Sequence, residues 1–132
     1  MARPLPQSLD GMYLDQLVEL SKERMPTSAE INACCAAGVG SEEELVDALA
    51  LNVARSYAAG KLGFVECDRI MNSLNVWSMN TRDRLLSDLA DQIYLAFDAG
   101  EYHHRGDDNT VDPEVKYTKP MIEKVLKETN AV

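Results

Sequence analysis

The chain has 132 residues, 45% of them hydrophobic, and a formal net charge of −9 at pH 7. This length is typical of one domain, and the hydrophobic fraction is sufficient for one core. The excess of acidic residues argues against binding to nucleic acid or to an anionic membrane surface, because both require clustered Lys and Arg. No apolar segment approaches the roughly 18 residues of a transmembrane helix, so we expect no membrane association.

The first forty residues predict an arm followed by two helices. Residues 1–8 include two prolines, so we expect a flexible N-terminal arm there, with a single helical domain spanning 9–132. A first helix is expected over 9–24, because apolar residues recur there at the spacing of one helical face. Thr27 followed by Glu30 is a capping-box pattern that opens a short second helix. The apolar face of the first helix consists of Leu9, Met12, Tyr13, Leu17 and Leu20.

The three cysteines argue against a disulfide framework. Cys34 and Cys35 are neighbours in the sequence and do not normally bridge to each other, and an odd count leaves one thiol over. The N terminus carries one arginine but no apolar run of the kind found in a signal peptide. We therefore expect reduced cysteines in a cytoplasmic protein.

Two further helices are expected between positions 41 and 80. The segment 41–60 opens with a serine, a good N-cap, and closes on Gly60, which suits the left-handed residue after a helix. The next helix carries apolar residues from Phe64 to Leu74. Residues 75–80 hold the single tryptophan and are either a break or a continuation of this helix, and both readings stay open. The buried face of the 41–60 helix is expected at Leu45, Leu49, Val53 and Tyr57.

A fifth helix and a last helix complete the predicted bundle. The fifth is expected from about Thr81 to Gly100, and the last is expected from Thr118, with Pro120 in its first turn, where proline is tolerated. Alternation of apolar and polar residues never persists long enough for a β-strand. The sequence therefore predicts an all-α protein, a single compact bundle of five to six helices.

The segments 41–60 and 81–100 align without a gap. They are identical at five positions, all of them Leu, Ala or Gly. One reading is a duplication of 40 residues, which gives two related helix-hairpin units. The other reading is that two helices obeying the same capping and core rules resemble each other, and both readings stay open. The identical pairs are Leu45–Leu85, Leu49–Leu89, Ala50–Ala90, Ala59–Ala99 and Gly60–Gly100.

Residues 101–117 lack helical periodicity and are expected to form the one long loop. Loops of this length are uncommon in compact domains and often carry function. Side chains able to act as ligands or catalysts gather there. They are Asp98 just before the loop, then Glu101, His103, His104, Asp107, Asp108, Asp112 and Glu114.

The composition of this loop suggests two chemical roles. As a metal site it lacks a recognised pattern, because adjacent histidines diverge on a helix and no zinc or calcium spacing fits. As an acid–base site it would bring Asp98, Glu101 and His103 into one cleft, but no nucleophile motif or phosphate-binding loop accompanies them. We therefore predict no catalytic residue, no metal ligand and no cofactor.

The reading we favour for most of these residues is structural. Tyr102 and Tyr117 flank the loop and are expected to hold its ends on the core, with their hydroxyls in hydrogen bonds. Asp98 is then either solvated or paired with Arg105. The stretch 112–114 (Asp-Pro-Glu) reads as a turn.

The function expected from these observations is that of a small acidic, non-enzymatic protein-interaction or regulatory domain. It would act through its acidic surface or through an exposed apolar stripe, which would also support a homodimer. One alternative is an acidic antagonist of a basic toxin or nuclease, and another is a small metal-binding enzyme that uses the 98–114 loop. The residues predicted to contact a protein partner are Glu101, His103, His104, Asp107 and Asp108.

Overall fold

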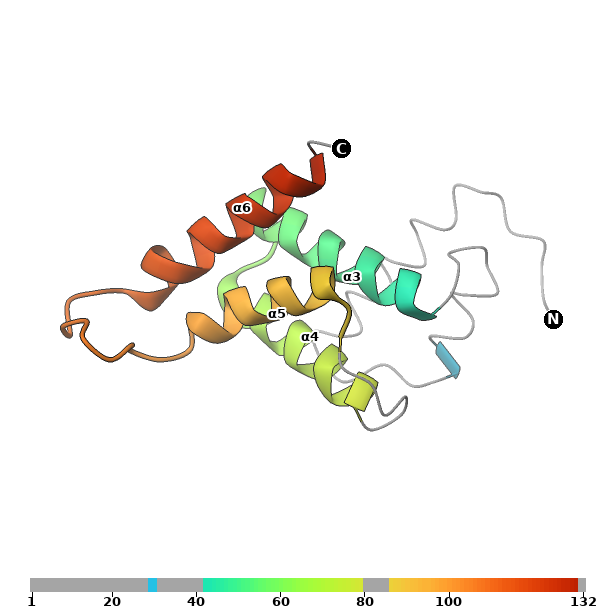
Figure 1. The fold of residues 1–132 in the computed structure, drawn as a ribbon, viewed down its shortest axis with the longest axis horizontal. Coiled ribbons are helices and arrows are strands. Elements are labelled where there is room, and N and C mark those ends of the chain that lie inside the picture. The colour runs from blue at the N-terminus through green and yellow to red at the C-terminus, as the bar shows by residue number, and fades with distance from the viewer. Residues whose placement is uncertain (1–28, 31–41, 80–85, 131–132) are drawn as a thin grey trace.

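The computed structural model describes residues 29–30, 42–79 and 86–130, and this part of the chain is a compact all-α bundle of four helices without a strand. The predicted arm at 1–8, most of the two helices expected before residue 41, and the pair Cys34 and Cys35 lie outside the described residues. Figure 1 shows the four helices. They are α3 (Glu42–Ala58), α4 (Phe64–Trp77), α5 (Asp88–Ala99) and α6 (Lys119–Asn130), and a π-helical turn, η3 (Glu114–Thr118), leads directly into α6.

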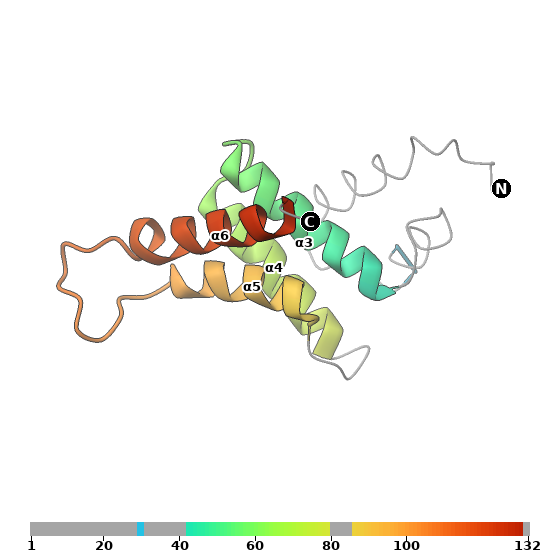
Figure 2. The ribbon, with the colours of Figure 1, turned by 45° about the horizontal axis from the view of Figure 1, so that its top comes forward.

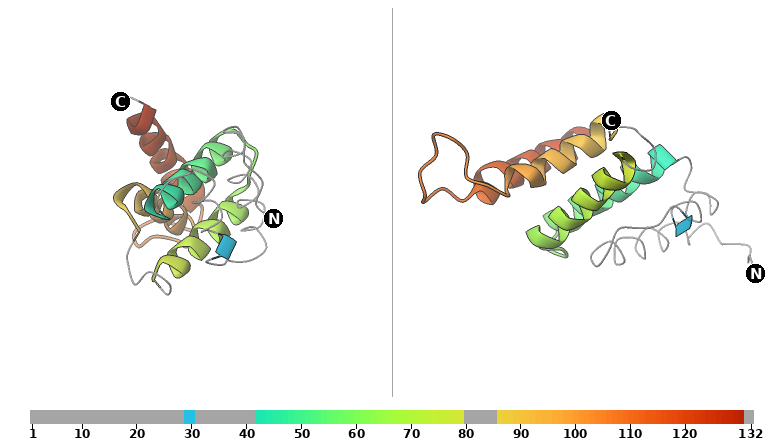
Figure 3. Two further views of the ribbon diagram at one scale, coloured as in Figure 1. Left: turned by 90° about the vertical axis from the view of Figure 1, so that its right-hand side faces the viewer. Right: turned by 90° about the horizontal axis from the view of Figure 1, so that it is seen from below.

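The helices pack as two layers. α3 contacts α4, and α5 contacts α6, and Figure 3 shows the α3–α4 pair and the α5–α6 pair as separate layers. α5 also contacts α3 and α4, so it touches each of the other three helices. Figure 2 shows α5 lying beside α6 over most of its length. The core therefore forms around α5.

Aromatic rings join three of the helices at the C-terminal end of α5. Phe97 is fully buried there. The Tyr57 ring of α3 meets it edge-on at 5.1 Å between centroids, and the Phe64 ring of α4 lies at 6.1 Å. The expected apolar face of α3 is buried at Leu45, Leu49 and Val53, while Tyr57 is partly buried. Other fully buried side chains of this core are Ile70, Met71, Leu74, Ile93 and Ile122.

The segment 41–60 folds as its pattern predicts. α3 begins at Glu42 and ends at Ala58, and Gly60 has a positive φ of 75°, the left-handed conformation expected after a helix. The open question at 75–80 is answered as far as residue 79, because α4 runs to Trp77 and the chain stays helical through the next two residues.

The predicted start of the fifth helix at Thr81 is wrong. Leu86 and Ser87 are not helical, and α5 begins only at Asp88. Ser87 is the N-cap, since its hydroxyl oxygen accepts the Ala90 N–H at 3.4 Å. Acidic residues in the first turn of α5 also favour this start, because they interact with the positive end of the helix dipole.

α3 and α5 run parallel and in register. The Ser87 hydroxyl just before α5 donates a hydrogen bond to the Asp47 carboxylate of α3, and Tyr57 packs on Phe97. Both contacts join residues that the 40-residue alignment makes equivalent. The aligned segments differ at their ends, however: α3 has 17 residues and α5 has 12, and Gly100 has φ −84° where Gly60 has 75°.

α6 begins at Lys119, directly after Thr118, with Pro120 in its first turn as predicted, but the Thr118 hydroxyl does not cap it. The helical stretch starts earlier, where the Asp112 carboxylate accepts the Glu114 N–H at 3.0 Å and Pro113 takes a position that needs no N–H donor. The Asp-Pro-Glu stretch is therefore a helix start and not a turn. Thr118 is buried inside this helical stretch, and its hydroxyl donates to the Ala96 carbonyl of α5 at 2.7 Å.

The turn before α6 is wider than an α-helical turn. The Lys119 N–H donates to the Glu114 carbonyl, five residues earlier. Pro120 follows, and its ring would crowd the carbonyl four residues before it in a regular α-helix, which accounts for the wider turn at this point.

Within the part of the chain that the structure describes, no helix combines the length and the apolar character needed to cross a membrane.

Gly100 tests the close approach of η3 and α4 to the end of α5. A Cβ at this position would collide with the Thr118 hydroxyl and lie 2.6 Å from Cε1 of Phe64, although the backbone conformation itself suits any residue. We expect Gly100→Ala to lower the free energy of unfolding in urea by about 1–3 kcal/mol, through overpacking. The matched control is Gly63→Ala, whose Cβ would meet only a Glu66 carboxylate oxygen at 3.9 Å. The control should cost less than about 1 kcal/mol, and equal losses in the two variants would contradict the close approach.

Candidate functional site

The segment 101–112, which we call the projecting loop, joins α5 to η3 and extends beyond the ends of the helices (Figures 1 and 2). It consists of hydrogen-bonded turns. The Asp107 N–H donates to the His104 carbonyl at 3.1 Å, next to Gly106 with φ 95°. The Asp108 carboxylate then accepts the Thr110 N–H at 2.8 Å. Local bonds of this kind fix the loop in one shape.

His104 ties the projecting loop to the bundle. Its ring lies between two tyrosine rings, 4.5 Å from Tyr102 and 3.8 Å from Tyr117, and it is nearly parallel to both, at 21° and 27°. Its Nε2 donates to the Ala99 carbonyl at 2.7 Å, since a carbonyl can only accept. The two tyrosines do not pack on the hydrophobic core as expected. They clamp a histidine that is anchored on the last residue of α5.

Asp107 makes the second connection within the loop. Its carboxylate accepts hydrogen bonds from Lys116 Nζ at 2.5 Å and from the Tyr117 hydroxyl at 2.6 Å. The bond from Lys116, followed by that from Tyr117, holds the pKa of Asp107 below its usual range. The loop is thereby joined to η3 as well as to α5.

The five residues predicted to contact a partner fall into two groups. Glu101, His103 and Asp108 are exposed, whereas His104 and Asp107 are partly buried and hold the loop together. No observation tests whether any of them contacts a protein, so that role stays a prediction.

The acid–base grouping expected of Asp98, Glu101 and His103 is replaced by a different carboxyl cluster. Glu101 turns towards α4, where its carboxylate accepts the Asn72 side-chain amide at 3.2 Å and shares a hydrogen bond with Asp68. Asp98 adds its negative charge to the same place. In the described part of the chain no ion pair joins Asp98 to Arg105.

Asp68 is the member of this cluster that sequence reasoning missed. Burial raises its pKa from 3.8 to about 8, with further contributions from the hydrogen bond to Glu101 and from the charges of Glu101 and Asp98. Two carboxyl groups can share a hydrogen bond only when one of them holds a proton. Nothing in the spacing of residues 68 and 101 indicates that they meet. Among the described residues, no group of three or more His, Cys, Asp or Glu could hold a metal ion.

The carboxyl pair predicts that stability falls as the pH rises. The folded state holds the Asp68 proton up to a pKa of about 8, whereas the unfolded chain releases it near 3.8. The stabilisation is therefore complete at low pH and is lost as the pH rises through about 8. Asp68→Asn can donate to Glu101 without a titrating proton, so its free energy of unfolding should depend less on pH in this window.

Urea unfolding at several pH values between about 4 and about 9 measures this difference. The control is Glu128→Gln, which removes an exposed carboxylate on α6 and should follow the wild-type pH profile. Identical profiles for wild type and Asp68→Asn would contradict a shared proton.

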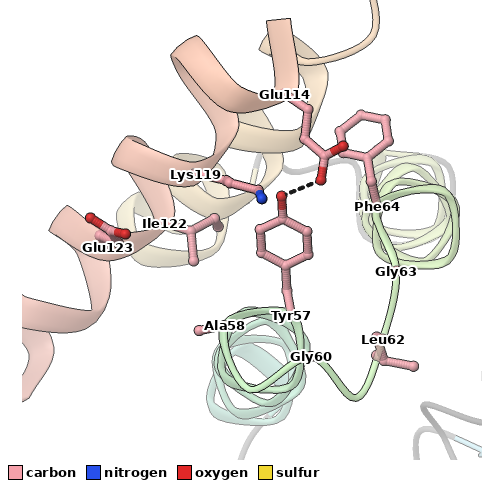
Figure 4. Close-up of a pocket in the computed structure, with 10 residues that line it drawn as sticks. All are labelled: Tyr57, Ala58, Gly60, Leu62, Gly63, Phe64, Glu114, Lys119, Ile122 and Glu123. Carbon is pink, nitrogen blue, oxygen red and sulfur yellow. Dashed lines mark hydrogen bonds between the residues drawn. The ribbon is translucent and has the colours of Figure 1, made fainter. Parts of the chain in front are cut away.

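A second candidate site is a cavity of about 500 Å³ between the α3–α4 turn and the start of α6, which we call the Tyr57 cavity. Its volume lies within the range of small-molecule sites. The Tyr57 hydroxyl donates to Glu114 Oε2 at 2.5 Å, and Figure 4 shows Lys119 pointing towards this pair. The lining residues are Tyr57, Ala58, Gly60, Leu62, Gly63, Phe64, Glu114, Lys119, Ile122 and Glu123.

Of the cavity residues, the sequence marked only Glu114 as a candidate for chemistry, and it did so as part of the loop. Tyr57 was assigned to the core and Glu114 to the end of the loop. Burial, followed by the hydrogen bond to Glu114 and the charge of that carboxylate, raises the pKa of Tyr57 above its ordinary value. The phenol therefore stays protonated and remains a donor to Glu114 at physiological pH.

The chain matches no protein-family model, no curated protein and no solved structure.

Proposed function

We propose that the chain is a small non-enzymatic protein-interaction domain of the cytoplasm and that the projecting loop is its contact surface. The observation that carries this proposal is that the loop stands away from the bundle and is braced by His104, Asp107 and their partners (Figure 2). A loop held in one shape loses little conformational entropy on binding. Loops on a rigid scaffold are also common places for recognition.

The exposed side chains of the loop suit a protein partner. Tyr102 remains 51% exposed although one face of its ring stacks on His104. Tyrosine is enriched in the energetically important centres of interfaces, because it combines a large apolar ring with a hydroxyl. His103 and Asp108 are exposed beside it.

Charge favours a basic partner. The projecting loop contains four acidic residues and one arginine, and the whole chain carries a net charge of −9. Complementary charge speeds association and selects partners. An antagonist of a basic toxin or nuclease is one protein of this kind. The other alternative, a metal-binding enzyme using 98–114, has no supporting observation in the described residues.

The proposal extends to the total number of helices and to the 40-residue duplication. We infer five to six helices in all, counting those expected over 9–24 and from Thr27. The duplication of 40 residues is supported by the parallel packing of α3 on α5, in which equivalent residues contact each other. The early start of α3 relative to α5 is the main difference between the two units.

The proposal predicts a partner whose binding depends on the loop. In the double variant His103→Ala/Asp108→Asn, the asparagine can still accept the Thr110 N–H while the exposed charge is lost. Affinity capture from cells of the source organism identifies proteins retained by the wild type, and purified components then give the dissociation constants. We expect the double variant to bind at least about tenfold more weakly, with its stability changed by less than about 0.5 kcal/mol.

The control is Lys124→Ala/Glu128→Gln, which alters two exposed residues of α6. It should bind as the wild type does, and the association rate should fall steeply with salt if the partner is basic. A partner that binds the loop variant and the wild type equally well would contradict the loop as the contact surface.

A further inference from the structure

We propose that the Tyr57 cavity binds a small organic ammonium group carried on an apolar arm. This site involves none of the residues of the projecting loop, and the inference does not depend on the proposed interaction function. Three features of the cavity support it: walls that are already fixed, a carboxylate held in place as an anchor, and a charge balance that favours a cation.

The aromatic walls of the cavity are positioned by the core. Both Tyr57 and Phe64 pack against the buried Phe97 ring, at 5.1 Å and 6.1 Å between centroids. Neither ring can move far without disturbing that packing. A ligand therefore meets a surface that needs little reorganisation, which favours binding.

Glu114 supplies the anchor. One of its carboxylate oxygens, Oε2, accepts the Tyr57 hydroxyl at 2.5 Å, and this bond orients the group. The other oxygen, Oε1, is left to accept a hydrogen bond from a ligand ammonium. Figure 4 shows the carboxylate of Glu114 between the rings of Tyr57 and Phe64. The negative charge of this carboxylate attracts a cation, and a charge-assisted hydrogen bond from an ammonium is stronger than one between neutral groups.

The charges that line the cavity favour a cation over an anion. Glu114 and Glu123 are acidic and Lys119 is basic, and in the described part of the chain no ion pair joins Lys119 to either glutamate. Lys119 is exposed, but its side chain points towards the Tyr57–Glu114 pair (Figure 4), so its positive charge opposes a bound ammonium. The two signs give a test, because removing Glu114 and removing Lys119 should change the affinity for an amine in opposite directions.

The rim of the cavity has room for a ligand. A Cβ placed on Gly60 would meet no atom within 4 Å, and one on Gly63 would meet only a Glu66 carboxylate oxygen at 3.9 Å. Ile122 and Leu62 contribute apolar surface for the arm of the ligand.

Titration of the full chain with 2-phenylethylamine, followed by amide NMR, tests the proposal. We expect saturable shifts at Gly63 and Phe64, with a dissociation constant on the order of millimolar for so small a ligand. Two probes of the same shape are controls, the neutral 2-phenylethanol and the anionic 3-phenylpropionate, and both should bind at least about tenfold more weakly. Nα-acetyl-lysine amide distinguishes the source of the ammonium: tighter binding of this probe points to a protein lysine, and tighter binding of phenylethylamine to a free amine.

Three variants complete the test. Glu114→Gln can still accept the Tyr57 hydroxyl but lacks the charge, so it should weaken amine binding about tenfold. Lys119→Met should strengthen it about threefold, and Lys124→Met, an exposed lysine of α6 outside the cavity, should leave it unchanged.

Several outcomes would overturn the ammonium site. They are an amine that binds no better than the alcohol, shifts confined to residues outside the cavity, or weaker amine binding in Lys119→Met. If Glu114→Gln does not fold, the probe series and the Lys119→Met variant still decide the question.

Discussion

The packing of two aromatic rings, Tyr57 and Phe64, around Phe97 is the interaction on which the rest of the structure depends. Phe97 is fully buried in the last turn of α5 and receives Tyr57 from α3 and Phe64 from α4. One residue earlier on α5, the Ala96 carbonyl accepts a hydrogen bond from the hydroxyl of Thr118. Thr118 is the last residue of η3, which leads directly into α6. All four helices are therefore joined within a single turn of α5, and the layers shown in Figure 3 are held together there.

Both candidate sites are attached to this junction. The projecting loop leaves α5 directly after it and is anchored back by His104 on the Ala99 carbonyl. The Tyr57 cavity uses two of the junction rings as walls. The core therefore positions both sites, which explains how a small domain can present both a shaped loop and a shaped cavity.

Helical periodicity was sufficient to predict the class of fold and the existence of α3, α4, α5 and α6, because a buried apolar face leaves a strong pattern. It did not predict η3, which lies in the segment 101–117 that was expected to be a loop. It failed at boundaries where several residues can act as caps. Thr81 and Ser87 are both good N-caps, and the second is favoured by the acidic first turn of α5 and by the hydrogen bond from Ser87 to Asp47 of α3. The helical stretch before α6 starts after Asp112 and not at Thr118, because the Thr118 hydroxyl lies inside the bundle and donates to the Ala96 carbonyl of α5.

The sites were less predictable than the fold because their residues are brought together by tertiary packing. The sequence marked the projecting loop by composition, but the Asp68–Glu101 pair and the Tyr57 cavity join residues from different helices with no local signal. The parallel register of α3 and α5 was present in the 40-residue alignment. The alignment alone does not show that equivalent residues touch, and the packing of Tyr57 on Phe97 in the structure does.

The most direct measurement of this account is the urea unfolding of Phe97→Ala. If the rings around Phe97 hold the four helices together, the free energy of unfolding should fall by about 3–5 kcal/mol, or the chain should fail to fold. The amide NMR signals of Tyr57, Phe64 and His104 should move together. A loss below about 1 kcal/mol, with those signals unchanged, would contradict the account.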